Sequence, residues 1–340
     1  MAALRKNMQS FRKLNNICTS YCRTSIARHL KTSNTVFSKG DPLEYFLRGD
    51  VETILRRITG FDPERTFFHH KVKYANRPTY KVLTDEELQQ EYQKGEEIKE
   101  RRLQMPPFMN CREEPDTIIA DDPDIAPAID SNYVFVDISE DYERIKGYSL
   151  RPVVIRHENG QLKPADWHTF DRVSQIYFPV PGREVYPPKM FEEDNLEPLL
   201  KEENYLYILE RACVQFEPDS SDFIRVTHRI YEHIAAHHCF DCLRSTRFFG
   251  PMAFYFAWIN KIEPLLAEMI GRDLLVDAID LINLKRIIHN QSIKEGDILK
   301  IIKDYYLEDS NKHHIEVLRD ALNDLEKRLE AKMQKKQESC

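Results

Sequence analysis

Glycine is scarce in this sequence, with 10 residues among 340. The shortage argues against a protein built on glycine-rich phosphate-binding loops, and against a β sandwich with many tight turns. The sequence contains no GxxxxGK(S/T), GxSxG or HExxH motif, and no GxGxxG motif after a predicted strand. It therefore carries none of the common signatures of nucleotide binding, serine hydrolysis or zinc-dependent proteolysis.

Long apolar runs and a dense set of cysteines are also missing. A membrane-spanning helix needs about 20 consecutive apolar residues; no run of that length occurs, so we expect no membrane partner. Seven cysteines in a chain of this length do not suggest a disulfide framework and fit a reducing compartment better. Hydrophobic residues make up 41% of the chain, which is enough for a globular core. The length predicts about two domains.

Acidic residues are absent from residues 1–40, which contain eight lysines and arginines. Leu4, Met8 and Phe11 lie on one side of a helical wheel, with basic residues on another. An amphipathic, basic and acid-free leader is typical of a mitochondrial transit peptide, and it predicts a protein of the mitochondrial matrix. The alternative is a disordered basic arm that binds nucleic acid, but such an arm would gain nothing from the apolar stripe.

Without this leader the chain is strongly acidic. Residues 41–340 contain 49 − 8 = 41 basic and 56 acidic residues, which gives a net charge of −15. Affinity for phosphate depends on basic groups, so a chain of this charge is a poor general binder of nucleic acid. Any contact with RNA is expected to be local.

The stretch from Gln215 to Ile259 contains two helix signals around which the chain is organised. The first is an apolar stripe at helical spacing, made by Phe223, Val226, Ile230 and Ile234. The second runs from Pro251 to Ile259 and is apolar on almost every side. A helix of that kind is normally buried at the centre of its domain. We therefore predict five core residues: Phe223, Ile230, Phe254, Phe256 and Trp258.

Residues 41–131 predict an extended segment with two helices and an acidic linker. Asp50 can cap a short helix that ends at Gly60. A capping box at Thr84-Asp85-Glu86-Glu87 begins a charged helix that reaches about Leu103. Its few apolar anchors are Leu88 and Tyr92. Residues 108–131 are acidic and contain three prolines, which predicts an extended linker or a strap over neighbouring structure.

Residues 132–189 predict a small α+β region, with strands at 133–138, 153–156 and 162–164. The last two strands flank Asn159-Gly160, a strong hairpin signal, and a helix that carries Trp167 and Phe170 follows. Residues 190–290 predict a helical domain, and residues 291–340 predict a charged helical tail. The expected fold is mainly α with a small antiparallel β-sheet: an extended N-terminal part and a C-terminal helical bundle or array.

Two groups of polar residues could bind a metal or carry chemistry. The first is the cluster His237, His238, Cys239 and Cys242. Zinc usually takes two spaced ligand pairs, whereas these four crowd within six residues and no second pair accompanies them. We therefore interpret them as half-buried cysteines and solvated histidines at a helix end and predict no metal site.

The second group is a row of carboxylates on one helix face, formed by Asp273, Asp277 and Asp280. Paired carboxylates can hold a metal or transfer protons. More often such a row is the solvated side of an amphipathic helix, and the other side of this helix is rich in leucine and isoleucine. We therefore expect solvated carboxylates here and predict no catalytic residue.

Four arginines close to the predicted core helix form the candidate contact site: Arg225, Arg229, Arg244 and Arg247. The first two share a helix face, and the second two enclose small hydroxyl residues at a predicted helix start. Guanidinium groups and free backbone N–H groups suit phosphate oxygens. They suit equally well the carboxylates of the chain's own acidic segments, or those of a partner protein. The residues alone leave these alternatives open.

Two central segments, QFEPDSSDFIRVTHRIYEHI and FDCLRSTRFFGPMAFYF, resemble the mitochondrial small-subunit ribosomal protein S-twenty-two family. Weaker matches occur in the same order: RPTYKVLTDEEL, YVFVDIS and QIYFPVPGR. The resemblance covers about residues 50–290, and the His-Cys cluster is not part of the family pattern. It implies a matrix protein of the small ribosomal subunit without catalytic activity, cofactor or small-molecule substrate. The implied partners are other mitochondrial small-subunit proteins and, by local contacts, small-subunit rRNA.

Three hypotheses follow. The first is a structural component of the mitochondrial ribosome's small subunit. The second is a helical matrix adaptor or ribosome assembly factor that binds transiently. The third is a zinc-dependent enzyme, which would contain stoichiometric metal bound through Cys239 and Cys242.

Overall fold

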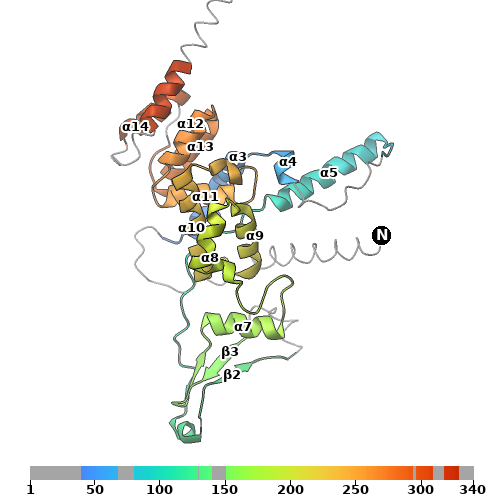
Figure 1. Ribbon diagram of the computed structural model, residues 1–340, viewed down its shortest axis with the longest axis vertical. Coiled ribbons are helices and arrows are strands. Elements are labelled where there is room, and N and C mark those ends of the chain that lie inside the picture. The colour runs from blue at the N-terminus through green and yellow to red at the C-terminus, as the bar shows by residue number, and fades with distance from the viewer. Residues whose placement is uncertain are drawn as a thin grey trace, which may run out of the picture. The chain divides into compact units, whose positions relative to one another are not determined.

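The computed structural model describes residues 40–67, 80–128, 130–139, 151–293, 296–308 and 318–328 (Figure 1). The chain forms two compact units. Unit 1 comprises the residues up to Asn110, Tyr205–Leu209 and the residues from Thr227 onward; unit 2 comprises Cys111–Asn204 and Glu210–Val226. The prediction of a mainly α protein with a small antiparallel sheet is confirmed. The predicted leader lies outside the described residues, apart from Gly40.

Unit 1 is helical. Its elements are α2 (Pro42–Phe46), α3 (Gly49–Thr59), α4 (Pro63–Thr66), α5 (Asp85–Arg102), the 3-10 helix η5 (Phe240–Leu243), α11 (Phe249–Trp258), α12 (Glu263–Gly271), α13 (Leu275–Ile288) and α14 (Ile298–Glu308). Residues 318–328 are also helical. Helices α9 (Tyr205–Gln215) and α10 (Ser221–His237) contribute residues to both units. None of the described helices is both long and apolar enough to cross a lipid bilayer.

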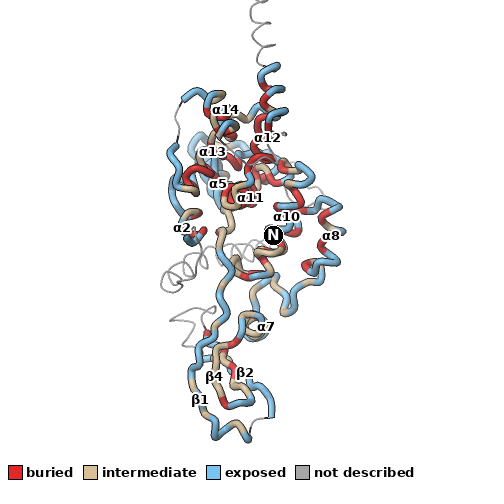
Figure 2. The backbone as a smooth tube through the Cα atoms, turned by 90° about the vertical axis from the view of Figure 1, so that its left-hand side faces the viewer, coloured by how far each residue is buried: buried red, intermediate tan, exposed pale blue. Residues whose placement is uncertain are grey.

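The core of unit 1 is built around α11, as the apolar sequence predicts. Nine of its ten residues are buried, and it packs against α3 and α13. Figure 2 shows the buried residues gathered in α10 to α13. Four of the predicted core residues are buried: Ile230, Phe254 and Phe256 in unit 1, and Phe223 in unit 2. Trp258, at the end of α11, is only half-buried and meets the Tyr45 ring edge-on, with ring centroids 5.9 Å apart.

Gly250 of α11 lies in a closely packed part of this core. A Cβ atom at this position would clash with the side chain of Met105 and would lie 3.4 Å from Oγ1 of Thr59. A larger residue at this position would therefore force the Met105 side chain, in the segment after α5, to move.

A buried polar triad joins three helices of unit 1. Glu263 of α12, Lys285 of α13 and Tyr305 of α14 are 3%, 6% and 5% exposed. The Lys285 Nζ atom lies 2.5 Å from the Tyr305 hydroxyl and 3.5 Å from Oε1 of Glu263, and the tyrosine hydroxyl donates to the same carboxylate at 3.0 Å. Each buried charge thus has a partner, which is the condition for tolerating it away from water.

Helix α5 begins as predicted but packs differently. The capping box is present: the Thr84 hydroxyl accepts from the Glu87 amide, and the Glu87 carboxylate accepts from the Thr84 amide. The prediction that Leu88 and Tyr92 anchor the helix is wrong, because they are 41% and 69% exposed and no residue of α5 is buried. The helix is too charged to offer a continuous apolar stripe.

The contacts of α5 gather at its C-terminal end. Lys99 Nζ lies 4.6 Å from the centroid of the Phe61 ring, and Arg102 donates to the Thr66 carbonyl at 2.9 Å.

Helix α3 ends at Gly60 as predicted, with a positive φ of 67° at that residue. The predicted start is wrong: the helix begins at Gly49, its N-cap is Arg48, and Asp50 lies inside the first turn. There the Asp50 carboxylate binds the Arg48 guanidinium, with Nη2 to Oδ2 at 2.7 Å. A negative charge in the first turn also opposes the helix dipole favourably.

Unit 2 contains a four-stranded antiparallel sheet in the order β1-β4-β3-β2. The strands are β1 (Ala120–Asp121), β2 (Tyr133–Val136), β3 (Val153–Arg156) and β4 (Gln161–Pro164). The predicted hairpin at Asn159-Gly160 is confirmed, and Gly160 adopts a φ of 84°. The acidic segment, predicted as a linker or strap, contributes β1 to this sheet and then forms the 3-10 helix η2 (Pro123–Ala128).

One face of this sheet is covered by α7 (Trp167–Tyr177). Phe170 and Val173 of α7, with Val136 of β2, pack against a small core of Val153, Ile155 and Ala165. Unit 2 also contains the 3-10 helix η4 (Lys189–Phe191) and α8 (Glu193–Lys201).

Candidate functional site

Arg244, one of the four predicted contact arginines, lies directly after η5 and is held by carboxylates of its own chain. Its guanidinium nitrogens lie 3.4 Å from Oε2 of Glu268 in α12 and 3.3 Å from Oδ2 of Asp277 in α13. Its Nε atom is 3.8 Å from Oδ1 of Asp241, and only 14% of its side chain is exposed. The guanidinium also lies over the Phe249 ring, 4.8 Å from the centroid.

Two further arginines complete this arginine–carboxylate network. Arg272 lies 2.6 Å from Asp241 and also pairs with Glu268. Arg65, just after the start of α4, binds Asp241 through both the side chain, at 2.8 Å, and the carbonyl, at 2.7 Å. The network thus alternates three arginines with three carboxylates and ties together α4, η5, α12 and the start of α13.

The pKa shifts in the network follow from two opposing causes. The hydrogen bond from Arg65 holds the pKa of Asp241 below its ordinary value, despite some desolvation. Burial raises the pKa of Glu268 and of Asp277, and it outweighs the attraction of Arg244 in both cases. Burial therefore dominates at Glu268 and Asp277, whereas the hydrogen bond from Arg65 dominates at Asp241.

The other three predicted arginines have different surroundings. Arg247 is half-buried, and its guanidinium lies 4.8 Å from the centroid of the neighbouring Phe248 ring; within the described residues it has no carboxylate partner. Arg225 of α10 binds Asp222 at 2.9 Å and the Phe191 carbonyl at 3.0 Å. Arg229, one turn further along α10, is exposed.

The His-Cys cluster is spread over the end of α10 and the start of η5. The His237 ring stacks on the ring of His233, with centroids 4.0 Å apart, and its Nδ1 atom lies 2.9 Å from the His233 carbonyl oxygen. The Cys239 thiol donates to the His237 carbonyl at 3.4 Å. Within the described residues, no three histidine, cysteine or acidic side chains come together as metal ligands would.

The acidic row does not form a solvated helix face, so that expectation is wrong. Asp280 is only 6% exposed, and its Oδ2 atom lies 3.3 Å from Nε of Arg57 in α3. Asp277 belongs to the arginine–carboxylate network, and Asp273 precedes α13 with a positive φ of 65°. Asp280 can be buried because Arg57 of α3 pairs with it, and Asp277 can be largely buried because Arg244, directly after η5, pairs with it.

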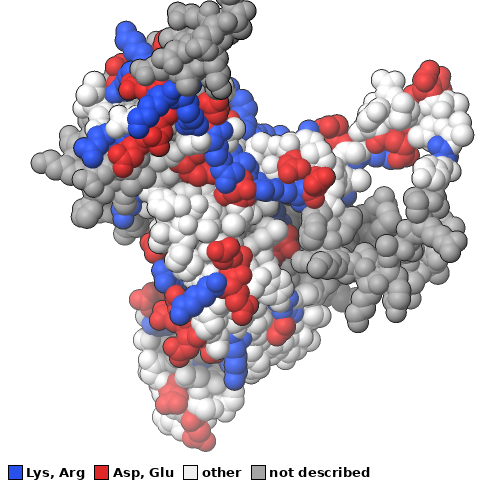
Figure 3. All heavy atoms as spheres, turned by 45° about the horizontal axis from the view of Figure 1, so that its top comes forward, with Lys and Arg blue, Asp and Glu red and all other residues white. Residues whose placement is uncertain are grey.

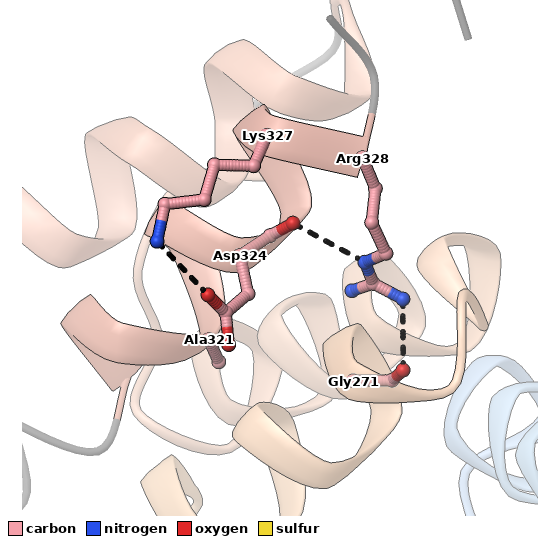
Figure 4. A pocket seen from close by; sticks show the side chains of 5 residues that line it. All are labelled: Gly271, Ala321, Asp324, Lys327 and Arg328. Atoms are coloured by element: carbon pink, nitrogen blue, oxygen red, sulfur yellow. Dashed lines mark hydrogen bonds and ion pairs between the residues drawn. The ribbon is translucent and has the colours of Figure 1, made fainter. Parts of the chain in front are cut away.

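A hollow beside the C-terminal end of α12 is lined by Gly271, Ala321, Asp324, Lys327 and Arg328 (Figure 4). Arg328 donates to the carbonyls of Gly271 at 2.9 Å and Ile270 at 3.0 Å, while Lys327 pairs with Asp324. The Ile270 carbonyl also accepts from the Asp273 amide at 3.1 Å, so Arg328 adds a side-chain donor to the carbonyl groups at the end of α12. Arg328, which lines this hollow, thus binds the C-terminal end of α12.

The surface drawn in Figure 3 mixes the two signs of charge. Lysine and arginine side chains lie beside aspartate and glutamate in several groups on this face, and large areas between these groups are uncharged.

Comparison with known proteins identifies the family. The family model described as mitochondrial 28S ribosomal protein S22 matches residues 44–290. The chain belongs to this family. It is 38% identical over 253 residues to the small ribosomal subunit protein mS22 of Mus musculus, covering 74% of this chain and 69% of that protein. It is also 38% identical over 257 residues to the protein of the same name from Bos taurus, with the same two coverages.

The family match includes the sheet of unit 2 and the whole arginine–carboxylate network. It begins within α2 and ends just after α13, so α14 and the helical residues 318–328 lie beyond it. The resemblance expected for about residues 50–290 is therefore confirmed.

Proposed function

We propose that this chain is a structural constituent of the small subunit of the mitochondrial ribosome, located in the matrix, and that it catalyses no reaction. The observation that carries the proposal is the family match over residues 44–290. The relatives with 38% identity are both named as small ribosomal subunit proteins. The chain then supports mitochondrial translation by holding its neighbours in place.

The charge distribution indicates which neighbours these are. Residues 41–340 carry a net charge of −15, and Arg65, Arg244 and Arg272 are already bound to carboxylates. Binding to phosphate needs basic groups that are not neutralised internally. Other ribosomal proteins are therefore the main partners, and rRNA is contacted only locally.

The four arginines divide into two roles under this proposal. Arg244 supports the scaffold through Glu268 and Asp277. Arg247, whose guanidinium lies over the Phe248 ring, is the better candidate for a contact with a neighbour, together with Arg225 and Arg229 on α10. A guanidinium already ordered by a ring loses less freedom on binding.

Sedimentation tests the proposed function. The tagged full-length chain is expressed in mitochondria, and the lysate is run on sucrose gradients at low and at high salt. A structural constituent sediments with the small subunit at both salt concentrations. Release by high salt would contradict the proposal and would indicate a transient adaptor or assembly factor. Stoichiometric zinc that is lost on replacing Cys239 and Cys242 would instead favour the enzyme hypothesis.

Two arginine variants test the division of roles. We expect Arg247→Ala to lower incorporation into the small subunit without changing the melting temperature of the purified chain. Arg244→Ala should lower both the incorporation into the small subunit and the melting temperature. A stable Arg244→Ala protein that fails to incorporate would show that Arg244 is itself a contact residue.

A further inference from the structure

Strand β2 forms one end of the sheet of unit 2. The Asp137 amide donates to the Pro152 carbonyl at 3.4 Å, and the register pairs Phe135 with Val154. In an antiparallel pair, alternate residues direct both backbone groups toward the partner strand. Residues 133, 135 and 137 therefore face β3, and Val134 and Val136 direct their N–H and C=O groups away from it. Among the described residues, no strand pairs with this outer edge.

Strand β2 has few of the features that normally protect an edge strand. Proteins block such edges with lysine, proline, a bulge or an inward charge. The sequence of β2 is YVFV, without charge or proline, and its pairing with β3 is regular over all four residues. Tyr133, Val134 and Phe135 are 48%, 43% and 53% exposed. An apolar edge of this kind is a template for a further strand.

The sheet face opposite α7 extends this apolar surface. Side chains alternate between the two faces of a strand. Because Val136 packs on the α7 side, Tyr133 and Phe135 lie on the other side. The register places Val154 and Pro164 beside Phe135, and Leu162 in the row of Tyr133. An added strand could therefore bury its own apolar side chains along this face.

The acidic residues around the outer edge of β2 favour a basic partner. Residues 111–139 contain eight acidic residues and one basic residue. Arg156 pairs with Asp122 and Lys163 pairs with Asp116, while the Arg151 guanidinium donates to the Asp137 carbonyl at 2.8 Å. Asp130, which precedes β2, is exposed and has no ion-pair partner among the described residues, so it would attract basic side chains on an incoming segment.

We propose that β2 is the docking site for an extended, lysine- and arginine-bearing segment of a neighbouring ribosomal protein, which adds to the sheet as a fifth strand. This inference rests on the proposed function, since it takes the partner from the assembled subunit. Backbone bonds to Val134 and Val136 provide the pairing. Phe135 and its neighbours on the outer face select apolar side chains, and Asp130 selects basic ones.

Photo-crosslinking in the assembled particle tests this docking. A benzophenone amino acid replaces Phe135 in the full-length chain, small subunits are isolated, and the crosslinked peptide is identified by mass spectrometry. We expect a basic segment of a neighbouring protein. A crosslink to rRNA, to a second copy of this chain or to its own residues would overturn the proposal, and so would the absence of any crosslink.

Val134→Pro provides the sharper second measurement. It removes an N–H group that faces outward and leaves the bonds to β3 intact. In the crosslinking chain we expect it to lower the crosslink yield about tenfold. The matched control is Ile176→Lys on α7, which is 54% exposed and should leave the yield unchanged. An unchanged yield with Val134→Pro would also overturn the proposal.

Asp130→Lys, which reverses an exposed charge outside the sheet, tests the same docking if the proline variant unfolds. It should lower the yield without changing the melting temperature, and an unchanged yield would count against the proposal. These outcomes are separate from the proposed function. If the unsubstituted chain fails to sediment with the small subunit, the function is wrong; if it sediments but Phe135 crosslinks elsewhere, only the docking is wrong.

Discussion

Helices α11 and α5 belong to the same unit and are stabilised in opposite ways. Helix α11 has ten residues, nine of them buried, and is apolar on every side. Helix α5 has eighteen residues, none of them buried. The longer helix depends on local interactions: a capping box and ion pairs between Glu91 and Lys94 and between Glu96 and Lys99.

The difference between the two helices indicates which of them contributes more to the stability of unit 1. Local pairs on a helix surface contribute only about 0.2–0.5 kcal/mol each, whereas a buried aromatic side chain contributes several times more. Changes near α11 should therefore affect the whole unit. Changes in α5 should affect that helix alone, which leaves its surface free to adapt to a neighbour.

The largest effect is expected from Phe254→Ala. Phe254 is fully buried, with the rings of Phe46 and Phe108 each 5.2 Å away between centroids. Removing the ring leaves a cavity and should lower the free energy of unfolding by about 3–5 kcal/mol. Urea unfolding followed by circular dichroism measures it. A loss below about 1 kcal/mol, the scale of a surface substitution, would mean that α11 is not the centre of the core.

Arg244→Ala should have an intermediate effect. It leaves Glu268 and Asp277 with largely buried carboxylates that have lost a partner. Hydrogen bonds to charged groups contribute about 1.5–3 kcal/mol, so we expect a loss of about 2 kcal/mol in urea unfolding. Arg272→Ala is the control: its side chain is 45% exposed, so it should cost less. An equal cost for the two would contradict the central place given to Arg244.

Asp241→Asn should give a smaller effect that depends on pH. Arg65 lowers the pKa of Asp241 in the folded state. The carboxylate therefore contributes stability above its unfolded pKa, and this contribution is lost as the pH falls through the folded pKa. Urea unfolding at several pH values should show a constant advantage of the unsubstituted chain near neutrality that shrinks below about pH 4. If the stability advantage of the unsubstituted chain grew as the pH fell, the prediction would be wrong.

The smallest global effect is expected from Thr84→Ala. Loss of an N-cap costs about 1 kcal/mol of helix stability. Because α5 buries no residue, that cost should appear as faster amide hydrogen exchange in the first turns of α5, with unchanged global unfolding. Tyr92→Ala, which removes an exposed ring but keeps the cap, is the control. A lower global melting temperature with Thr84→Ala would show that α5 is coupled to the core after all.

Sequence patterns predicted the elements whose signals are local. The capping box at Thr84, the hairpin at Asn159-Gly160 and the apolar run of α11 each depend on neighbouring residues and were found where expected. Strand β1 was missed because two residues in an acidic, proline-bearing segment carry no alternation. Only the pairing with β4 makes them a strand.

The surroundings of the candidate arginines could not be predicted in the same way. The carboxylates around Arg244 come from positions 3, 24 and 33 residues away in sequence, so their meeting depends on how η5, α12 and α13 pack. Helix α12 itself was not separated from its neighbours. Asn260 and Lys261 provide only a short polar break between two apolar helices, and Pro264, which lies in the first turn of α12, was not recognised as the start of a new helix.

The triad of Glu263, Lys285 and Tyr305 has a practical consequence for anyone who shortens this chain. A fragment that ends at residue 290, where the family match ends, would keep Lys285 and Glu263 but would lose Tyr305 and helix α14, which covers them. The side chains of Glu263 and Lys285, which are buried in the full chain, would then be exposed to solvent beside an uncovered apolar surface. Expression of the shorter piece should give aggregates, whereas a boundary placed after α14 should preserve a soluble product.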